Sequence, residues 1–229
     1  MTFQRVPWAN VKTRIARTWQ QGQHFPIIAP TGRGKTVLIK ELLPLRDHTV
    51  FFGTKVIDEE YDSLLKTGFK RLDRWPPKAW QERVMLWPRP ERTIVGTKAN
   101  QKLVFREALD SLFRRGKWTV VLDELHWMAH DLGLYDEIAT LHHQGRSSKL
   151  TLVSGFQRPA FVPRIVYSSA THLAVWGTND PSDLKQLSSF TGTSVRQWQE
   201  TMPTLDDFEF VYMNIRARNV PPVITQVVR

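Results

Sequence analysis

A stretch near the start of the chain, residues 25–43 (FPIIAPTGRGKTVLIKELL), constrains the fold more than any other. It joins a short apolar segment, a turn of small residues, and a run with apolar residues at helical spacing that stops at Pro44. Gly32 and Gly34 let the turn curve, so that successive backbone N–H groups face inward on an anion. The following helix adds its positive dipole end. The stretch therefore predicts a phosphate-binding loop between a buried strand and a helix.

The loop also assigns chemistry to single side chains. Lys35 is placed to reach the β- and γ-phosphates of a nucleoside triphosphate, and the Thr36 hydroxyl is placed to ligate magnesium. We therefore expect ATP and Mg²⁺ as ligands. Ala29 stands where the signature has its first glycine; the extra methyl group would be unfavourable if this position needed a positive φ. The expected nucleotide-binding residues are Ala29, Pro30, Thr31, Gly32, Arg33, Gly34, Lys35, Thr36 and Val37.

A second apolar segment ends on two carboxylates. Residues 118–124 (WTVVLDE) predict a buried strand with Asp123 and Glu124 at its C-terminal end. An Asp in this place can hold magnesium, and the adjacent Glu can orient and polarise an attacking water. Alone this pattern is weak evidence, but its pairing with the phosphate-binding loop makes it specific. Gln157 follows another predicted strand, and ligands of α/β sheets gather at the carboxyl ends of strands.

Length and composition favour one domain. A chain of 229 residues, 41% of them hydrophobic, can bury one sizeable core, and we expect an α/β fold with a mostly parallel central sheet flanked by helices. The expected parts are a basic N-terminal arm at 1–24, the main domain at 25–213 and an extended tail at 214–229. No apolar run approaches the roughly 18 residues of a membrane span, and cysteine is absent. We therefore expect a soluble, cytoplasmic protein without membrane contact or disulfides.

Charge points to a polyanionic partner. Lys and Arg number 32 against 22 Asp and Glu, a formal net charge of +10. The irregular segment at about 57–98 interleaves basic and aromatic residues, which suits contact with a nucleic-acid backbone. Its candidates for DNA contact are Lys66, Lys70, Arg71 and Arg74. Trp80 and Trp87 are better explained as a local core that holds this insertion. The arm at 1–24 could lie on a neighbouring subunit or a phosphate backbone, or pack as an amphipathic helix on its own domain.

The order of these motifs resembles that of FtsK/HerA-type P-loop ATPases, ring motors that pump double-stranded DNA. The likeness rests on the loop 29–36, the strand 120–124, the Gly145-Arg146 connector and the strand end 157–159. The chain looks most like the small genome-packaging ATPases of phages. The resemblance implies a RecA-like fold of the ASCE class and a homo-oligomeric ring, a pentamer or hexamer. It also implies double-stranded DNA and a viral portal or capsid vertex as partners and, for a viral protein, the host cytoplasm.

The resemblance further implies roles for single residues. The triphosphate and its magnesium would be held by Lys35, Thr36 and Asp123. Glu124 would act on the attacking water, and Gln157 would sense the γ-phosphate. Arg146 would insert into the neighbouring subunit's site, with Arg158 and Arg164 as rivals and an ordinary helix-end arginine as the plain alternative. Lys55, just past a strand predicted at 49–52, resembles the position from which these motors place a basic residue in the pore.

Other functions use the same motifs. A related motor could transfer plasmid or chromosomal DNA rather than package a genome. A P-loop kinase would pass the phosphate to a small molecule, but the paired Asp123 and Glu124 and the basic aromatic segment favour water as the acceptor. A non-enzymatic DNA-binding adaptor would have a degenerate ATP site, and the near-complete motifs argue against it.

Overall fold

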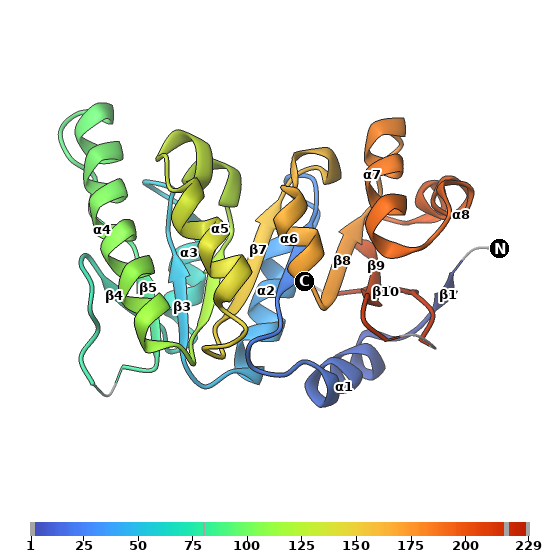
Figure 1. Ribbon diagram of the computed structural model, residues 1–229, viewed down its shortest axis with the longest axis horizontal. Helices are drawn as coiled ribbons and strands as arrows, with labels where there is room; N and C mark the ends of the chain where they lie inside the picture. Colours follow the sequence, from blue (N-terminus) through green and yellow to red (C-terminus); the bar gives the residue numbers. More distant parts are fainter. Residues whose placement is uncertain (1–2, 80, 218–219, 228–229) are drawn as a thin grey trace.

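One ten-stranded sheet runs through the molecule (Figure 1). The computed structural model describes residues 3–79, 81–217 and 220–227. The strand order is β1-β10-β9-β8-β2-β7-β6-β3-β5-β4. The strands are β1 (Gln4–Arg5), β2 (Phe25–Ile28), β3 (Thr49–Phe52), β4 (Lys70–Leu72), β5 (Arg83–Leu86), β6 (Thr119–Leu122), β7 (Thr151–Phe156), β8 (His172–Trp176), β9 (Glu209–Asn214) and β10 (Val223–Gln226). Among these strands every pairing is parallel except those of β9 with β8 and β10. The predicted α/β fold with a mostly parallel sheet is confirmed.

Helices cover both faces of this sheet. They are α1 (Trp8–Thr18), α2 (Lys35–Leu42), α3 (Glu59–Leu65), α4 (Ile94–Arg115), α5 (Tyr135–Gln144), α6 (Arg164–Ser169), α7 (Pro181–Thr191) and α8 (Val195–Thr201). Because successive strand residues point to opposite faces, Val120 and Leu122 join the core under α4 to α8, whereas Val121 joins the core under α1 to α3. Figure 1 shows α4 to α7 along the face toward the viewer.

The parallel strands bring the motif-bearing loops together at their carboxyl ends. In the sheet β2 lies between β7 and β8, and β6 lies on the other side of β7. The segments that follow β2, β6, β7 and β8 therefore emerge together at the carboxyl end of the sheet. This edge holds the phosphate-binding loop, the Asp-Glu pair and Gln157.

The segment at 57–98 is more regular than its sequence indicates. It contributes α3 and adds β5 and β4 as parallel strands at one end of the sheet. Trp75 and Trp87 are buried, the latter as expected for a local core, while Trp80 lies outside the described residues. Helix α4 begins at Ile94, where the Thr93 side chain accepts a hydrogen bond from the Gly96 N–H. The buried residues of α4 begin at Gln101, whereas Ile94 and Val95 in its first turn are exposed.

The two terminal segments take part in the fold. Val11, Ile15 and Trp19 are buried against the sheet, so α1 packs as an amphipathic helix on its own domain. Residues 223–226 were expected in an extended arm but form strand β10, with Ile224 fully buried. The Val-Pro-Pro turn that suggested an arm directly precedes this strand. No helix in the described part of the chain is long and apolar enough to cross a membrane.

Candidate active site

The loop between β2 and α2 has the backbone that its glycines predict. Gly32 and Gly34 have φ of 79° and 99°, in the left-handed region that other residues avoid. Ala29 is not among the residues with positive φ in the described part of the chain. Its N–H donates to the Phe156 carbonyl of the neighbouring strand at 2.9 Å. The replacement of the signature's first glycine by Ala29 therefore places no strain on the backbone.

The two sequence motifs meet at Lys35. Its Nζ donates to the Asp123 carbonyl at 2.9 Å and lies 3.2 Å from Asp123 Oδ1. Glu124 Oε1 is 3.8 Å from the same nitrogen. The Lys35 side chain is 11% exposed and that of Asp123 2%. Two segments some ninety residues apart in the sequence thus form one buried cluster, with a cation between the positions expected for phosphate and metal.

The residues around Lys35 suit a triphosphate and a hard cation. Loop residues, Thr36, Asp123, Glu124 and Gln157 line one cavity of about 290 Å³. Asp123 Oδ1 is buried and accepts no hydrogen bond from the described residues, although Lys35 neutralises it. A hydroxyl and a carboxylate oxygen are ligands that Mg²⁺ prefers. The donor set of Thr36 and Asp123 therefore fits the expected magnesium.

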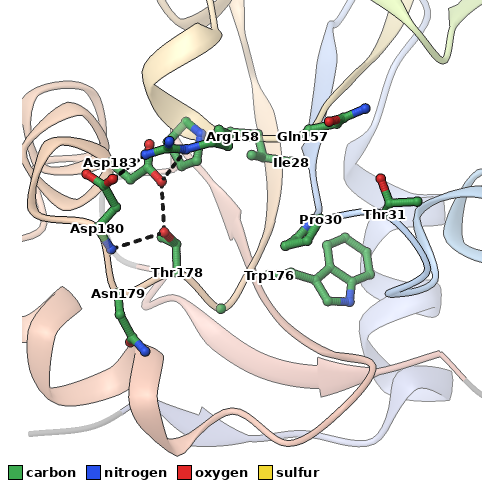
Figure 2. Close-up of a pocket in the computed structure, with 12 residues that line it drawn as sticks. Ile28, Pro30, Thr31, Gln157, Arg158, Trp176, Thr178, Asn179, Asp180 and Asp183 are labelled. Atoms are coloured by element: carbon green, nitrogen blue, oxygen red, sulfur yellow. Dashed lines mark hydrogen bonds and ion pairs between the residues drawn. The ribbon is translucent and has the colours of Figure 1, made fainter.

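Gln157 also reaches this site. It directly follows β7, is exposed, and lines both the 290 Å³ cavity and an adjoining cavity of about 400 Å³. Figure 2 shows Gln157 and Thr31 on one side of the larger cavity and Arg158 with two aspartates on the other. Arg158 pairs with Asp180 and, at 3.3 Å, with Asp183. Arg158 is thus engaged within its own subunit, which weakens its case as a residue acting on a neighbour.

Arg146 lies at the amino ends of the parallel strands, opposite the carboxyl ends where the phosphate-binding loop lies. It precedes β7, whereas Lys35 follows β2, and these two strands are parallel. A Cβ atom at Gly22, which precedes β2, would lie 3.1 Å from the Arg146 carbonyl oxygen. The exposed Arg146 side chain therefore cannot serve the loop of its own chain. Arg164 is exposed at the start of α6.

Lys55 lies in the 290 Å³ cavity and apart from the other predicted DNA contacts. Its Nζ donates to Asp58 Oδ2 at 2.6 Å, and Asp58 also caps α3. Burial alone would lower the pKa of Lys55, but the hydrogen bond and the negative charges of Asp58, Asp123 and Glu124 outweigh it and raise the pKa. The sequence singled out Lys55 but indicated neither its partner Asp58 nor its place in this cavity, because loop 53–58 carries no motif.

The remaining predicted DNA contacts are exposed at the β4 end of the sheet. Lys70 and Arg71 belong to edge strand β4, and Lys66 and Arg74 flank it. The Arg71 guanidinium lies 4.2 Å from the centre of the Trp87 ring, and its Nε donates to the Trp87 carbonyl at 3.1 Å. The structure thus groups four of the five predicted residues on one exposed basic edge.

Sequence reasoning missed a third cavity, of about 310 Å³, on the other side of the loop. Arg33 of the loop forms an ion pair with Asp207 there. Strand β9 starts at Glu209, and Phe208 directly before it has a φ of 69°. The pattern of apolar residues could not reveal this turn, because Phe is also favoured in strands.

Fold and site together define a P-loop NTPase fold in which Glu124 directly follows the buried Asp123 at the end of β6. No protein-family model and no curated protein matches the sequence. Solved structures do match. The DNA-packaging ATPase B204 from Sulfolobus turreted icosahedral virus has a TM-score of 0.63 at 18% identity, covering 92% of this chain and 100% of its own.

Two further solved structures are similar. VirB4 of Thermoanaerobacter pseudethanolicus has a TM-score of 0.65 at 10% identity, over 90% of this chain and 89% of its own. The pCW3 conjugation coupling protein TcpA, solved with ATPgS, has a TM-score of 0.55 at 15% identity, over 90% of this chain and 60% of its own. The resemblance to FtsK/HerA-type P-loop ATPases, stated from the sequence motifs, is confirmed at the level of the fold.

Proposed function

We propose that the protein hydrolyses ATP and uses the cycle to move double-stranded DNA, as a homo-oligomeric ring that packages a viral genome. The observation that carries the proposal is the contact of Lys35 with Asp123 and Glu124, because hydrolysis needs the phosphate-binding lysine and both carboxylates in one site. B204, which matches along nearly the whole of both chains, is a DNA-packaging ATPase, and this likeness supports packaging as the task of the proposed motor. A portal or capsid vertex would then be the docking partner.

Each site residue has a defined task in this proposal. Within the loop 29–37, the backbone N–H groups from Thr31 onward and the ammonium group of Lys35 bind the triphosphate, because Pro30 has no N–H and that of Ala29 is donated to Phe156. Thr36 and Asp123 would hold Mg²⁺, which supplies charge neutralisation at the phosphates. Glu124, less buried than Asp123, orients the attacking water and accepts its proton. Gln157 contacts the γ-phosphate side of the cavity.

Arg146 is proposed to act on a neighbouring subunit. Its place at the far edge of the sheet excludes action in its own site, and it carries no ion pair among the described residues. A trans arginine is worth roughly 10³ to 10⁵ in rate in the GTPases where it has been measured. DNA contact is proposed for Lys66, Lys70, Arg71 and Arg74 at edge strand β4. Lys55 lies between that strand and Glu124.

An ATPase titration tests the proposal. Hydrolysis is measured at low salt with duplex DNA, single strands and RNA, beside a native mass measurement. We expect stimulation by duplex DNA that falls steeply with salt, since neutralised phosphates release counterions. If no nucleic acid changed the rate of ATP hydrolysis, the proposed DNA-translocating activity would be refuted. A monomer that phosphorylates a metabolite would establish the kinase alternative. Undetectable ATP binding would favour the non-enzymatic adaptor.

A further inference from the structure

The 310 Å³ cavity continues the phosphate-binding loop on the side away from the carboxylates. It is lined by Pro30 and Arg33 of the loop, by residues 176–179 after β8, and by residues of the segment 202–209 before β9. In the sheet β8 adjoins β2 on one side, whereas β6, which carries the carboxylates, lies beyond β7 on the other. A nucleotide with its γ-phosphate beside Glu124 therefore extends its nucleoside toward this cavity.

An aromatic ring stands where the nucleoside would leave the loop. Phe208 is half-buried and lines the cavity. A Cβ atom on Gly34 would lie 3.5 Å from Phe208 Cδ1, so the ring packs against the loop at the N-terminus of α2. The N-terminus of α2 is where phosphate groups bind, so Phe208 lies beside the bound ligand. Phe208 thus offers a flat apolar surface next to the nucleoside.

The turn that presents Phe208 is held from several sides. The buried Glu209 carboxylate accepts a hydrogen bond from the Asp206 N–H at 2.9 Å and another from Arg5 Nε at 2.9 Å. The ion pair of Arg33 with Asp207 ties the turn to the loop. Phe208 itself has a φ of 69°, which is unfavourable for a non-glycine residue and persists only where the surroundings fix it. Such strain is typical of ligand-binding positions.

We propose that the base of the bound nucleotide stacks on Phe208. The inference deepens the proposed function and rests on it. Every base has a π-face, but a purine covers more of the ring than a pyrimidine does.

The test separates the base from the phosphates. Isothermal titration calorimetry gives the Kd of magnesium-ATP and of magnesium-tripolyphosphate for the parent and for Phe208→Leu, which retains an apolar side chain without the aromatic face. We expect ATP affinity to fall between about 5-fold and about 100-fold, and tripolyphosphate affinity to change less than about twofold. Phe208→Trp should keep ATP affinity near that of the parent. Phe113→Ala, at a half-exposed ring on α4, is the matched control and should change neither affinity.

Other outcomes overturn the inference. Equal losses for both ligands would mean that Phe208 supports the loop and not the base. Unchanged ATP affinity in Phe208→Leu would mean that no stacking occurs. If the parent bound tripolyphosphate as tightly as ATP, the base site would be refuted while the triphosphate site stood. Binding of neither ligand by the parent would refute the proposed function itself.

Discussion

The Lys35–Asp123 pair should make a measurable contribution to folding in the absence of nucleotide. Both side chains are largely buried, 11% and 2% exposed, and their charged atoms are 3.2 Å apart. Lys35→Met leaves a buried carboxylate without its counter-charge, which costs about 3 to 5 kcal/mol of unfolding free energy. Asp123→Asn removes the negative partner and leaves the buried Lys35 ammonium group without a counter-charge. The double variant Lys35→Met/Asp123→Asn removes both charges, so we expect it to cost at least about 2 kcal/mol less than the sum of the single changes.

Urea denaturation of the four proteins without nucleotide measures this coupling. The Lys98–Asp131 pair is the matched control, because it joins the same residue types at 3.3 Å but its side chains are 37% and 41% exposed. The double-mutant cycle on this exposed pair should give a coupling free energy of about 0 to 1 kcal/mol. Additive effects at Lys35 and Asp123, or equal coupling in both pairs, would show that burial does not strengthen the contact and would refute the reasoning.

Further predictions concern catalysis, coupling and pH. Glu124→Gln should bind ATP but hydrolyse it at least about 100-fold more slowly, whereas Lys35→Ala should lose ATP binding; equal turnover by Glu124→Gln and the parent would remove Glu124 from the mechanism. Mixing Arg146→Ala with Glu124→Gln subunits should restore some activity, and complete absence of rescue would count against a trans role. Lys55→Met should lower the ratio of DNA-stimulated to basal hydrolysis several-fold, whereas Lys66→Met should weaken DNA binding without lowering that ratio at saturating DNA; an unchanged ratio in Lys55→Met would refute its coupling role. Burial lowers the pKa of His24 to about 4 and that of His172 to about 3, so both stay neutral in the folded state while the unfolded chain takes up protons below about 6.5. Unfolding free energy should therefore be full above pH 6.5 and fall by up to about 1.4 kcal/mol per histidine per pH unit below it. Urea denaturation between pH 7 and 5 should show a weaker dependence in His24→Gln, and an unchanged slope would contradict this.

The sequence could specify the residues proposed for catalysis because they stand next to one another in local patterns. Strand, loop and helix at 25–43 are consecutive, and Asp123 and Glu124 end their own strand. Parallel strand order then brings Lys35 and Asp123 together without any further information. Strand β10 was missed because a four-residue run after two prolines has too little pattern to distinguish a strand from an extended arm.

The proposed nucleoside side of the site could not be found in this way. Arg33 and Asp207 are far apart in the sequence and meet only because β8 and β9 pair next to β2. Neither the turn at 206–208 nor its positive φ has a motif, since an aspartate pair before an apolar run is typical of many turns. The residues of this cavity are brought together by tertiary packing of distant segments and not by local sequence propensity.

The same sheet order defines how DNA at the basic edge could affect hydrolysis. Strands β5 and β3 separate β4 from β6, so a DNA contact at Arg71 is remote from Glu124. A continuous set of contacts spans the gap: Arg71 donates to the Trp87 carbonyl at 3.1 Å, and Trp87 Nε1 donates to the Lys55 carbonyl at 2.6 Å. Lys55 then pairs with Asp58 in the cavity that Glu124 lines. Contact alone does not establish coupling, which requires an element with two arrangements that both ligands bias. In the proposed function Lys55 would be such an element, because a DNA phosphate and Asp58 would compete for one ammonium group whose charge Glu124 also feels.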